Sequence, residues 1–127
     1  MAKPNVLIVE DDTAMADTLA SMTHLLGYRS RVVHSARAAI SAATKEKPDL
    51  ILLDLNLPGI NGFEVCRYLK RDPQLSNTQV IFVSVEGGSD RMQLAREAGA
   101  AAYLIKPVGL DELEETIAEV LQSAEEG

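Results

Sequence analysis

Residues 49–61 read DLILLDLNLPGIN, and this stretch decides the fold of the chain. Four apolar residues, 50–53, lead directly into Asp54, and Leu57-Pro58-Gly59 breaks the chain three residues later. A short apolar run bounded by turn signals is typical of a buried strand in a parallel sheet. Asp54 would then lie at the carboxyl end of this strand, where open α/β sheets place their ligands.

The rest of the chain alternates short apolar runs with amphipathic stretches. Apolar, β-branched runs predict strands over residues 6–9, 31–34, 50–54, 79–84 and 101–105. Apolar residues at helical spacing predict helices over residues 14–26, 36–46, 63–71, about 90–98 and 110–121. This alternation predicts right-handed crossovers and a parallel sheet with helices on both faces.

Capping residues and breakers set the expected helix ends. Asp12 or Thr13 is expected to cap the first helix, Ser35 the second, and Ser89 or Asp90 the fourth. We expect one domain over residues 1–127, with a core of about 4–122. Residues 123–127 are expected to form a frayed tail or the start of a linker.

Composition and charge exclude several classes of protein. The net charge of −7 and the pI near 4.7 argue against direct binding of nucleic acid or of an anionic membrane, because both need a basic patch. No apolar run approaches the roughly 20 residues of a membrane span, and the first residues lack a signal peptide's apolar core. A single cysteine, Cys66, forms no internal disulfide, so we expect a cytoplasmic protein.

Five polar side chains fall at the carboxyl ends of four predicted strands. They are Glu10, Asp11, Asp54, Ser84 and Lys106. Parallel strands collect these ends along one edge of the sheet, so we expect the five side chains to meet there. This coincidence is the strongest functional signal in the sequence.

Three converging carboxylates need a compensating charge. Two carboxylates about 4 Å apart repel each other by roughly 4 kcal/mol at an effective dielectric constant near 20. The cluster of Glu10, Asp11 and Asp54 must therefore raise a pKa or bind a cation, and an all-oxygen ligand set beside phosphate chemistry favours Mg²⁺. Asp54 could then attack phosphorus and form an aspartyl phosphate. Lys106 and Ser84 would supply a positive charge and a hydroxyl to the phosphoryl oxygens.

Each residue also has a simpler explanation when taken alone. Asp11 or Asp12 alone is better explained as a helix cap, Ser84 as an ordinary hydroxyl at a strand end, and Lys106 as a surface lysine. His34 is expected to be an ordinary polar residue away from the acids. The joint order of acid pair, acid, hydroxyl and Lys-Pro, each ending its own strand, favours the functional interpretation.

This order resembles the receiver domain of two-component response regulators, including single-domain regulators of the chemotaxis type. The matching segments are VLIVEDD (6–12), LILLDLNLPGINGFEV (50–65), VIFVS (80–84) and EAGAAAYLIKP (97–107). The resemblance covers essentially the whole chain. It implies a flavodoxin-like fold with strand order 2-1-3-4-5.

The resemblance also implies a phosphorelay role and a metal site. Asp54 would accept phosphate from a histidine kinase or a phosphotransfer protein. Glu10, Asp11, Asp54 and the main-chain carbonyl of Asn56 would hold Mg²⁺. The chain would be a signalling switch and not an enzyme, with only self-phosphorylation and self-dephosphorylation as its chemistry.

Such receivers work as switches, and the resemblance implies how. Ser84 would move onto the phosphoryl group, Tyr103 would turn inward, and the face made by helix four, strand five and helix five would change. A downstream protein or an attached output domain would read that face. Asn56, Val85 and Glu86 would tune rates, and the bulk of Val85 should make phosphotransfer or hydrolysis slower than in a Val85→Ala variant.

Two functions of other classes remain open at this point. A phosphohydrolase could use Asp54 as its nucleophile, but such enzymes usually need a general acid two residues on, where this chain has Asn56. A flavodoxin-like electron carrier would need a phosphate-binding loop after the first strand, where this chain has three acids. Turnover of free phosphomonoesters or visible flavin absorbance would favour these alternatives.

Overall fold

The computed structural model describes residues 3–126 as a five-stranded parallel sheet in the order β2-β1-β3-β4-β5. The strands are β1 (Asn5–Val9), β2 (Arg29–Val33), β3 (Leu50–Asp54), β4 (Gln79–Ser84) and β5 (Ala102–Ile105). The helices are α1 (Thr13–Leu25), α2 (Ala36–Lys45), α3 (Gly62–Arg71), α4 (Ser89–Glu97) and α5 (Leu110–Glu126). The flavodoxin-like fold and the strand order expected from the sequence are confirmed.

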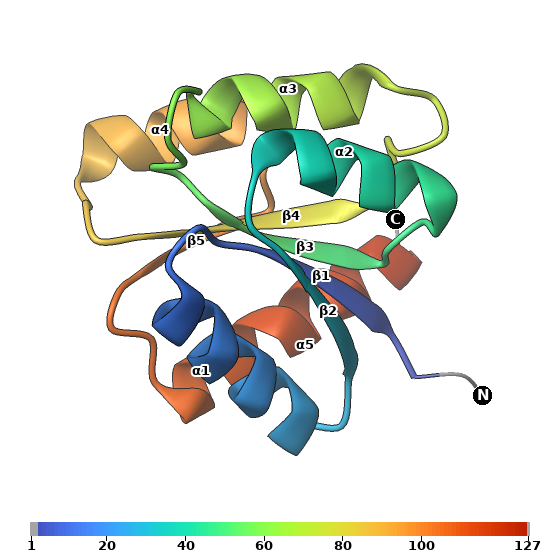
Figure 1. Cartoon of the computed structure of the whole chain (residues 1–127), viewed down its shortest axis with the longest axis vertical. Helices are drawn as coiled ribbons and strands as arrows, with labels where there is room; N and C mark the ends of the chain where they lie inside the picture. The colour runs from blue at the N-terminus through green and yellow to red at the C-terminus, as the bar shows by residue number, and fades with distance from the viewer. Residues whose placement is uncertain (1–2, 127) are drawn as a thin grey trace.

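Helices cover both faces of the sheet, with α2, α3 and α4 on one face and α1 and α5 on the other (Figure 1). Alternate residues of β1 lie on opposite faces of the sheet. Leu7 and Val9 pack in the core beneath the first group of helices, and Val6 and Ile8 pack against α1 and α5. Because β1 and β3 are buried along their whole length, the apolar runs of the sequence carry no polar alternation.

Strand register aligns the carboxyl ends of the strands. Val9 pairs with Leu53, so Glu10 and Asp54 are the next residues on adjacent strands. Ser84, the last residue of β4, pairs with Ile105. Lys106 follows Ile105 directly, and its backbone N–H donates to the carbonyl of Ser84 at 2.8 Å.

Two of the predicted helix caps are confirmed and one is wrong. Asp12 accepts a hydrogen bond from the backbone N–H of Met15 at 3.0 Å, and Ser35 accepts one from Ala38 at 3.1 Å. The cap of α4 is Gly88, which makes no side-chain capping bond. Its φ of 113° lies in the left-handed region, which favours glycine over Ser89 or Asp90 at this position.

Strand β2 and helix α5 differ from the prediction by two residues or more at one end. Strand β2 begins at Arg29, because its first residues pair with the start of β1, and it ends at Val33. Helix α5 continues to Glu126, so the tail predicted from residue 123 is wrong for residues 123–126, and residue 127 lies outside the described residues. No breaker follows Leu121, and Ser-Ala-Glu-Glu adds another helical turn.

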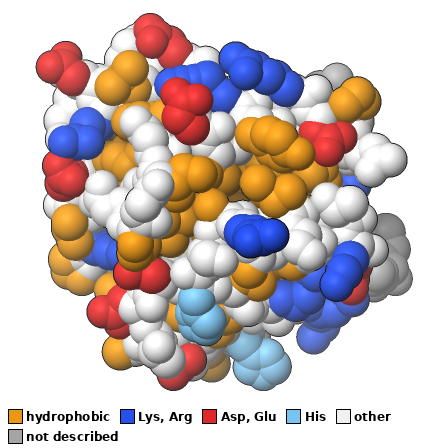
Figure 2. All heavy atoms as spheres, turned by 45° about the horizontal axis from the view of Figure 1, so that its top comes forward, with side chains coloured by type: hydrophobic (Ala, Val, Ile, Leu, Met, Phe, Trp, Pro, Cys, Tyr) orange, Lys and Arg blue, Asp and Glu red, His pale blue; other side chains and the backbone are white. Residues whose placement is uncertain are grey.

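The face turned forward in Figure 2 gathers hydrophobic side chains between Lys and Arg side chains. Between α2 and α3 a hollow of about 290 Å³ is lined in part by Ile40, Ile60 and Tyr68. Ile60 and Tyr68 remain 42% and 51% exposed.

Within residues 3–126, no helix combines the length and the apolar character needed to cross a membrane.

Candidate functional site

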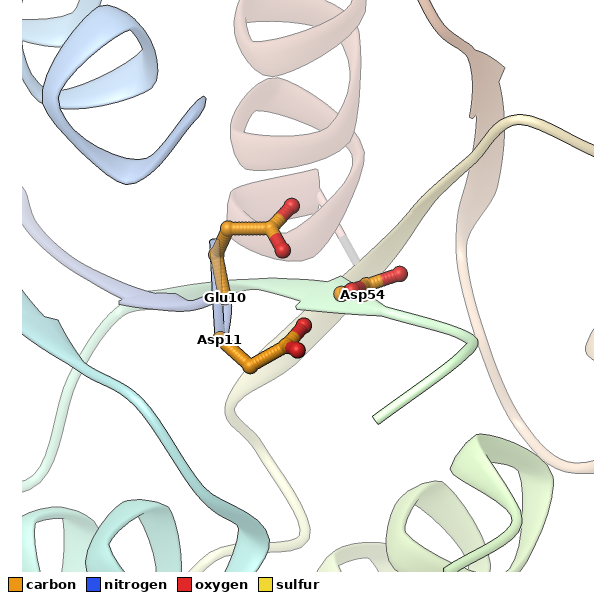
Figure 3. A group of neighbouring side chains, drawn as sticks. All are labelled: Glu10, Asp11 and Asp54. Atoms are coloured by element: carbon orange, nitrogen blue, oxygen red, sulfur yellow. The ribbon is translucent and has the colours of Figure 1, made fainter. Parts of the chain in front are cut away.

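Three carboxylates meet at the carboxyl edge of the sheet. Glu10, Asp11 and Asp54 each offer one oxygen, and these three oxygens all lie within 4.8 Å of one another. Figure 3 shows Glu10 and Asp11 reaching from the end of β1 toward Asp54 at the end of β3. Glu10 and Asp54 are 1% and 5% exposed, whereas Asp11 is exposed to solvent. The convergence predicted from the sequence is therefore present.

Lys106 brings a positive charge into this cluster. Its Nζ lies 2.5 Å from Oε1 of Glu10 and 3.8 Å from Oδ1 of Asp54. Only 12% of the lysine side chain is exposed, so water screens these interactions weakly. Lys106 is thus a largely buried partner of the acids and not the surface lysine of the simpler explanation.

The pKa of Glu10 is raised above its ordinary value of 4.5. Burial of the side chain is the largest cause, and the neighbouring Asp54 raises the pKa further. The ammonium of Lys106 and the backbone N–H of Asp12, which donates to Oε2 at 3.2 Å, act in the opposite direction. Glu10 therefore carries an energetic cost as a carboxylate, which a bound cation would reduce.

A chain of hydrogen bonds connects Asp54 with the end of β4. The backbone N–H of Asn56 donates to Oδ1 of Asp54 at 3.0 Å, and the Asn56 side-chain amide donates to Oγ of Ser84 at 3.4 Å. Ser84 is fully buried, and its Oγ also accepts from the backbone N–H of Glu86 at 3.1 Å. The predicted hydroxyl and the predicted phosphoacceptor are thus linked through Asn56.

Residues 6–118 match the family model described as the response regulator receiver domain. The match covers every strand-end residue of the cluster, from Glu10 to Lys106. The chain belongs to the response regulator receiver domain family.

Several proteins with curated descriptions are similar to this chain along most of its length. Sporulation initiation phosphotransferase F of Bacillus subtilis is 31% identical over 121 residues, which cover 95% of this chain and 96% of that protein. Transcriptional regulatory protein AfsQ1 of Streptomyces coelicolor is 34% identical over 96% of this chain. The chain spans about half the length of AfsQ1, at 53%, and of the DNA-binding response regulator MtrA of Mycobacterium leprae, at 48%.

Solved receiver structures superpose closely on this one. A CheY-like receiver domain protein from Methanospirillum hungatei has a TM-score of 0.90 at 28% identity, with 98% of both chains covered. Chemotaxis protein CheY4 of Vibrio cholerae has a TM-score of 0.89 at 26% identity, over 94% of this chain and 99% of that one. The recognition made from the sequence motifs is confirmed.

Tyr103 of this receiver is tied to the loop that follows β4. Its hydroxyl donates to the backbone carbonyl of Glu86 at 2.5 Å, and its ring lies 6.2 Å from that of Phe82 in a tilted arrangement. The ring is half-buried. Val85, between Ser84 and Glu86, is 68% exposed.

Two residues of the receiver's site were not found from the sequence. His34 was placed away from the acids, and this is wrong, because its Nδ1 lies 2.9 Å from the backbone carbonyl of Glu10. The pairing of Val9 with Val33 makes Glu10 and His34 neighbours, so strand order could have revealed the contact. Arg91 forms an ion pair with Glu86, and the spacing of these two residues gave no signal.

The donor set of this receiver fits a hard divalent cation. All three side chains offer carboxylate oxygens, the ligands that Mg²⁺ prefers, and they come from two adjacent strands that hold them in place. A cation at this position would lower the cost of keeping Glu10 ionised beside Asp54. The residues present are therefore compatible with the magnesium site that the family resemblance implies.

Proposed function

We propose that this receiver is a phosphorylation-dependent switch of a two-component system, with Asp54 as the phosphoacceptor. The supporting observation is the position of the Asp54 carboxylate, which is 5% exposed, lies with Glu10 and Asp11, and has Lys106 within 3.8 Å. The proposed donor is a phosphohistidine on a histidine kinase or phosphotransfer protein. We place this chemistry in the cytoplasm, and we assign the chain no activity beyond its own phosphorylation and dephosphorylation.

In the proposed reaction an oxygen of Asp54 attacks the phosphorus atom of the donor. The phosphorus–nitrogen bond breaks, and its electron pair stays on the imidazole of the donor. The N–H of Asn56 holds one carboxylate oxygen, which orients the side chain for attack. The ammonium of Lys106 would move from Glu10 to the phosphoryl oxygens, and the Ser84 hydroxyl would donate a hydrogen bond to the same group.

Glu10, Asp11, Asp54 and the main-chain carbonyl of Asn56 are the groups that would hold Mg²⁺. When bound, the ion would supply positive charge that screens the carboxylates from the incoming phosphoryl group. Asp11 is exposed, so its side chain can reach the ion through water as well as directly.

Ser84 and Tyr103 are the proposed switch residues, because both are hydrogen-bonded to the backbone of Glu86. Movement of the Ser84 hydroxyl onto a phosphoryl group would release the N–H of Glu86 and loosen the loop that holds Tyr103. The neighbouring face of α4, β5 and α5 exposes Leu94, Ile105 and Leu110 at 44%, 41% and 40%. We propose that a downstream protein or an attached output domain reads this face.

Asn56, Val85 and Glu86 are the proposed rate-tuning residues. Asn56 and Glu86 both donate hydrogen bonds to Oγ of Ser84, and Val85 adds bulk directly after Ser84 in the chain. A phosphohydrolase remains the alternative function, but the side-chain amide of Asn56 is not acidic enough to protonate a leaving group at the position where such an enzyme needs an acid.

The proposal is tested by incubation with Mg²⁺ and a small phosphodonor, followed by intact-protein mass spectrometry. We expect the native protein to gain one phosphoryl group and the Asp54→Ala variant to gain none. Asp90→Asn, which removes an exposed acid on α4, is the matched control and should behave like the native protein. Absence of the adduct in the native protein, or its persistence in Asp54→Ala, would refute the proposal.

A further inference from the structure

A hollow of about 420 Å³ is lined by the segment that follows Asp54, starting at Leu55, and by Arg91 in the first turn of α4. Asn56 lines it and connects it to the acids, because the backbone N–H of Asn56 donates to Asp54. Ile60 and Phe63 give it apolar walls, and Asn61 adds a polar group. The hollow therefore offers a small mixed surface next to the proposed phosphoacceptor.

Arg91 is the one cation among the described residues that line this hollow. Its guanidinium forms an ion pair with the carboxylate of Glu86, and the two side chains are 39% and 43% exposed. Glu86 lies two residues after Ser84, so the pair stands at the rim of the site. An exposed pair of this kind is weak and can exchange partners with an anion in the hollow.

We propose that this hollow receives the leaving group of a small acyl phosphate, and that Arg91 is a specificity-determining residue that binds the departing carboxylate. The inference rests on the proposed function of Asp54. A carboxylate oxygen of Asp54 attacks phosphorus, and the bond from phosphorus to the bridging oxygen of the donor breaks. The electron pair stays on that oxygen, the donor leaves as a carboxylate, and no proton is transferred.

The charge of the leaving group decides which donors Arg91 favours. An acyl phosphate leaves as an anion, which a guanidinium binds through two parallel hydrogen bonds. A phosphoramidate or a phosphohistidine releases a nitrogen group that carries no negative charge, so Arg91 gives it no comparable stabilisation. Glu86 competes with the anion for Arg91 and thereby restrains phosphorylation by small acyl phosphates.

The experiment compares the phosphorylation rates with acetyl phosphate and with phosphoramidate at one Mg²⁺ concentration. Arg91→Gln should lower the ratio of the acetyl phosphate rate to the phosphoramidate rate by about tenfold. Glu86→Gln, which frees the guanidinium, should raise the ratio by about threefold. Arg91→Lys should fall between Arg91→Gln and the native protein, because it keeps the charge and loses the two-bond geometry.

Arg96→Gln is the matched control. It removes the same charge from the same helix, at an exposed residue whose guanidinium donates to Gln93 and does not line the hollow. An unchanged ratio in both Arg91 variants would overturn this inference and leave the role of Asp54 intact. If neither donor phosphorylates the native protein, the proposed function fails and this inference fails with it.

Discussion

Nζ of Lys106 lies 2.5 Å from Oε1 of Glu10, although 96 residues separate the two in the chain. The side chains are only 12% and 2% exposed, so the ion pair is almost completely shielded from water. The lysine thus serves as the internal counter-ion of the acidic cluster. The same ammonium is the proposed ligand of the phosphoryl group, and this double role has measurable consequences.

Lys106→Gln should have opposite effects on stability and on metal binding. Without Mg²⁺ the variant should lose about 2 kcal/mol of unfolding free energy, because Glu10 keeps its burial and loses its counter-ion. Mg²⁺ should bind more tightly than in the native protein, because a competing positive charge is gone. Urea unfolding and calorimetric titration measure the two effects, and the exposed Lys45→Gln is the control. Weaker Mg²⁺ binding in Lys106→Gln would contradict this prediction.

The affinity for Mg²⁺ should fall as the pH is lowered. Burial, the largest cause, raises the pKa of Glu10, so protons compete with the metal at a pH above the ordinary value of 4.5. Glu10→Gln should bind Mg²⁺ more weakly than the native protein and with a flatter pH dependence. A native affinity that stays constant down to pH 4.5 would show that Glu10 is not a ligand.

The raised pKa of Glu10 also predicts that its contribution to the stability of the metal-free protein increases as the pH is lowered. The folded state holds the Glu10 proton more tightly than the unfolded chain does. This contribution to stability is fully present below pH 4.5 and is lost as the pH rises through the raised pKa. The difference in unfolding free energy between the native protein and Glu10→Gln isolates this group from the other acids.

Gly62 should tolerate no side chain. An added Cβ would lie 2.8 Å from the backbone oxygen of Leu55 and 2.9 Å from its Cα, and these atoms belong to the segment that follows Asp54. Gly62→Ala should therefore cost about 2 kcal/mol of unfolding free energy despite the better helix propensity of alanine. Gly109→Ala, where a Cβ meets no atom within 4 Å, should be neutral within about 0.5 kcal/mol. Equal stabilities of the two variants would refute the close approach.

Tyr103→Phe should loosen the loop after β4. The variant loses the hydrogen bond from the tyrosine hydroxyl to the carbonyl of Glu86 and keeps the ring against Phe82. We expect faster hydrogen exchange of the amides of residues 86–88 and a loss of about 1 kcal/mol of stability. Tyr68→Phe, at a tyrosine that is 51% exposed, should change neither quantity.

The edge of the sheet that carries the site could be predicted because it depends on strands alone. Each apolar run ended in a polar residue, and parallel strands bring such ends together whatever the loops do. The strand ends alone therefore predict correctly that Glu10, Asp11 and Asp54 converge. The contact of Lys106 with Glu10 follows the same logic, with the side chains joining the ends of two strands that are not adjacent.

The network after β4 could not be predicted, because it depends on loop backbone conformation. Glu86 bonds to Ser84 through its N–H, to Tyr103 through its carbonyl and to Arg91 through its side chain. The left-handed φ of Gly88, which ends this loop, is compatible with many paths of the chain. The contact of His34 with Glu10, in contrast, could have been predicted, because the expected strand order 2-1-3-4-5 places β2 beside β1.

The most direct test of the central claim locates the phosphoryl group on a single side chain. After incubation with Mg²⁺ and a phosphodonor, borohydride reduction converts an aspartyl phosphate to homoserine, which tandem mass spectrometry finds in the peptide sequence. We predict homoserine at position 54 and at no other aspartate, and none when Mg²⁺ is withheld. Homoserine at position 11, or labelling of Asp54 that does not depend on Mg²⁺, would contradict the account.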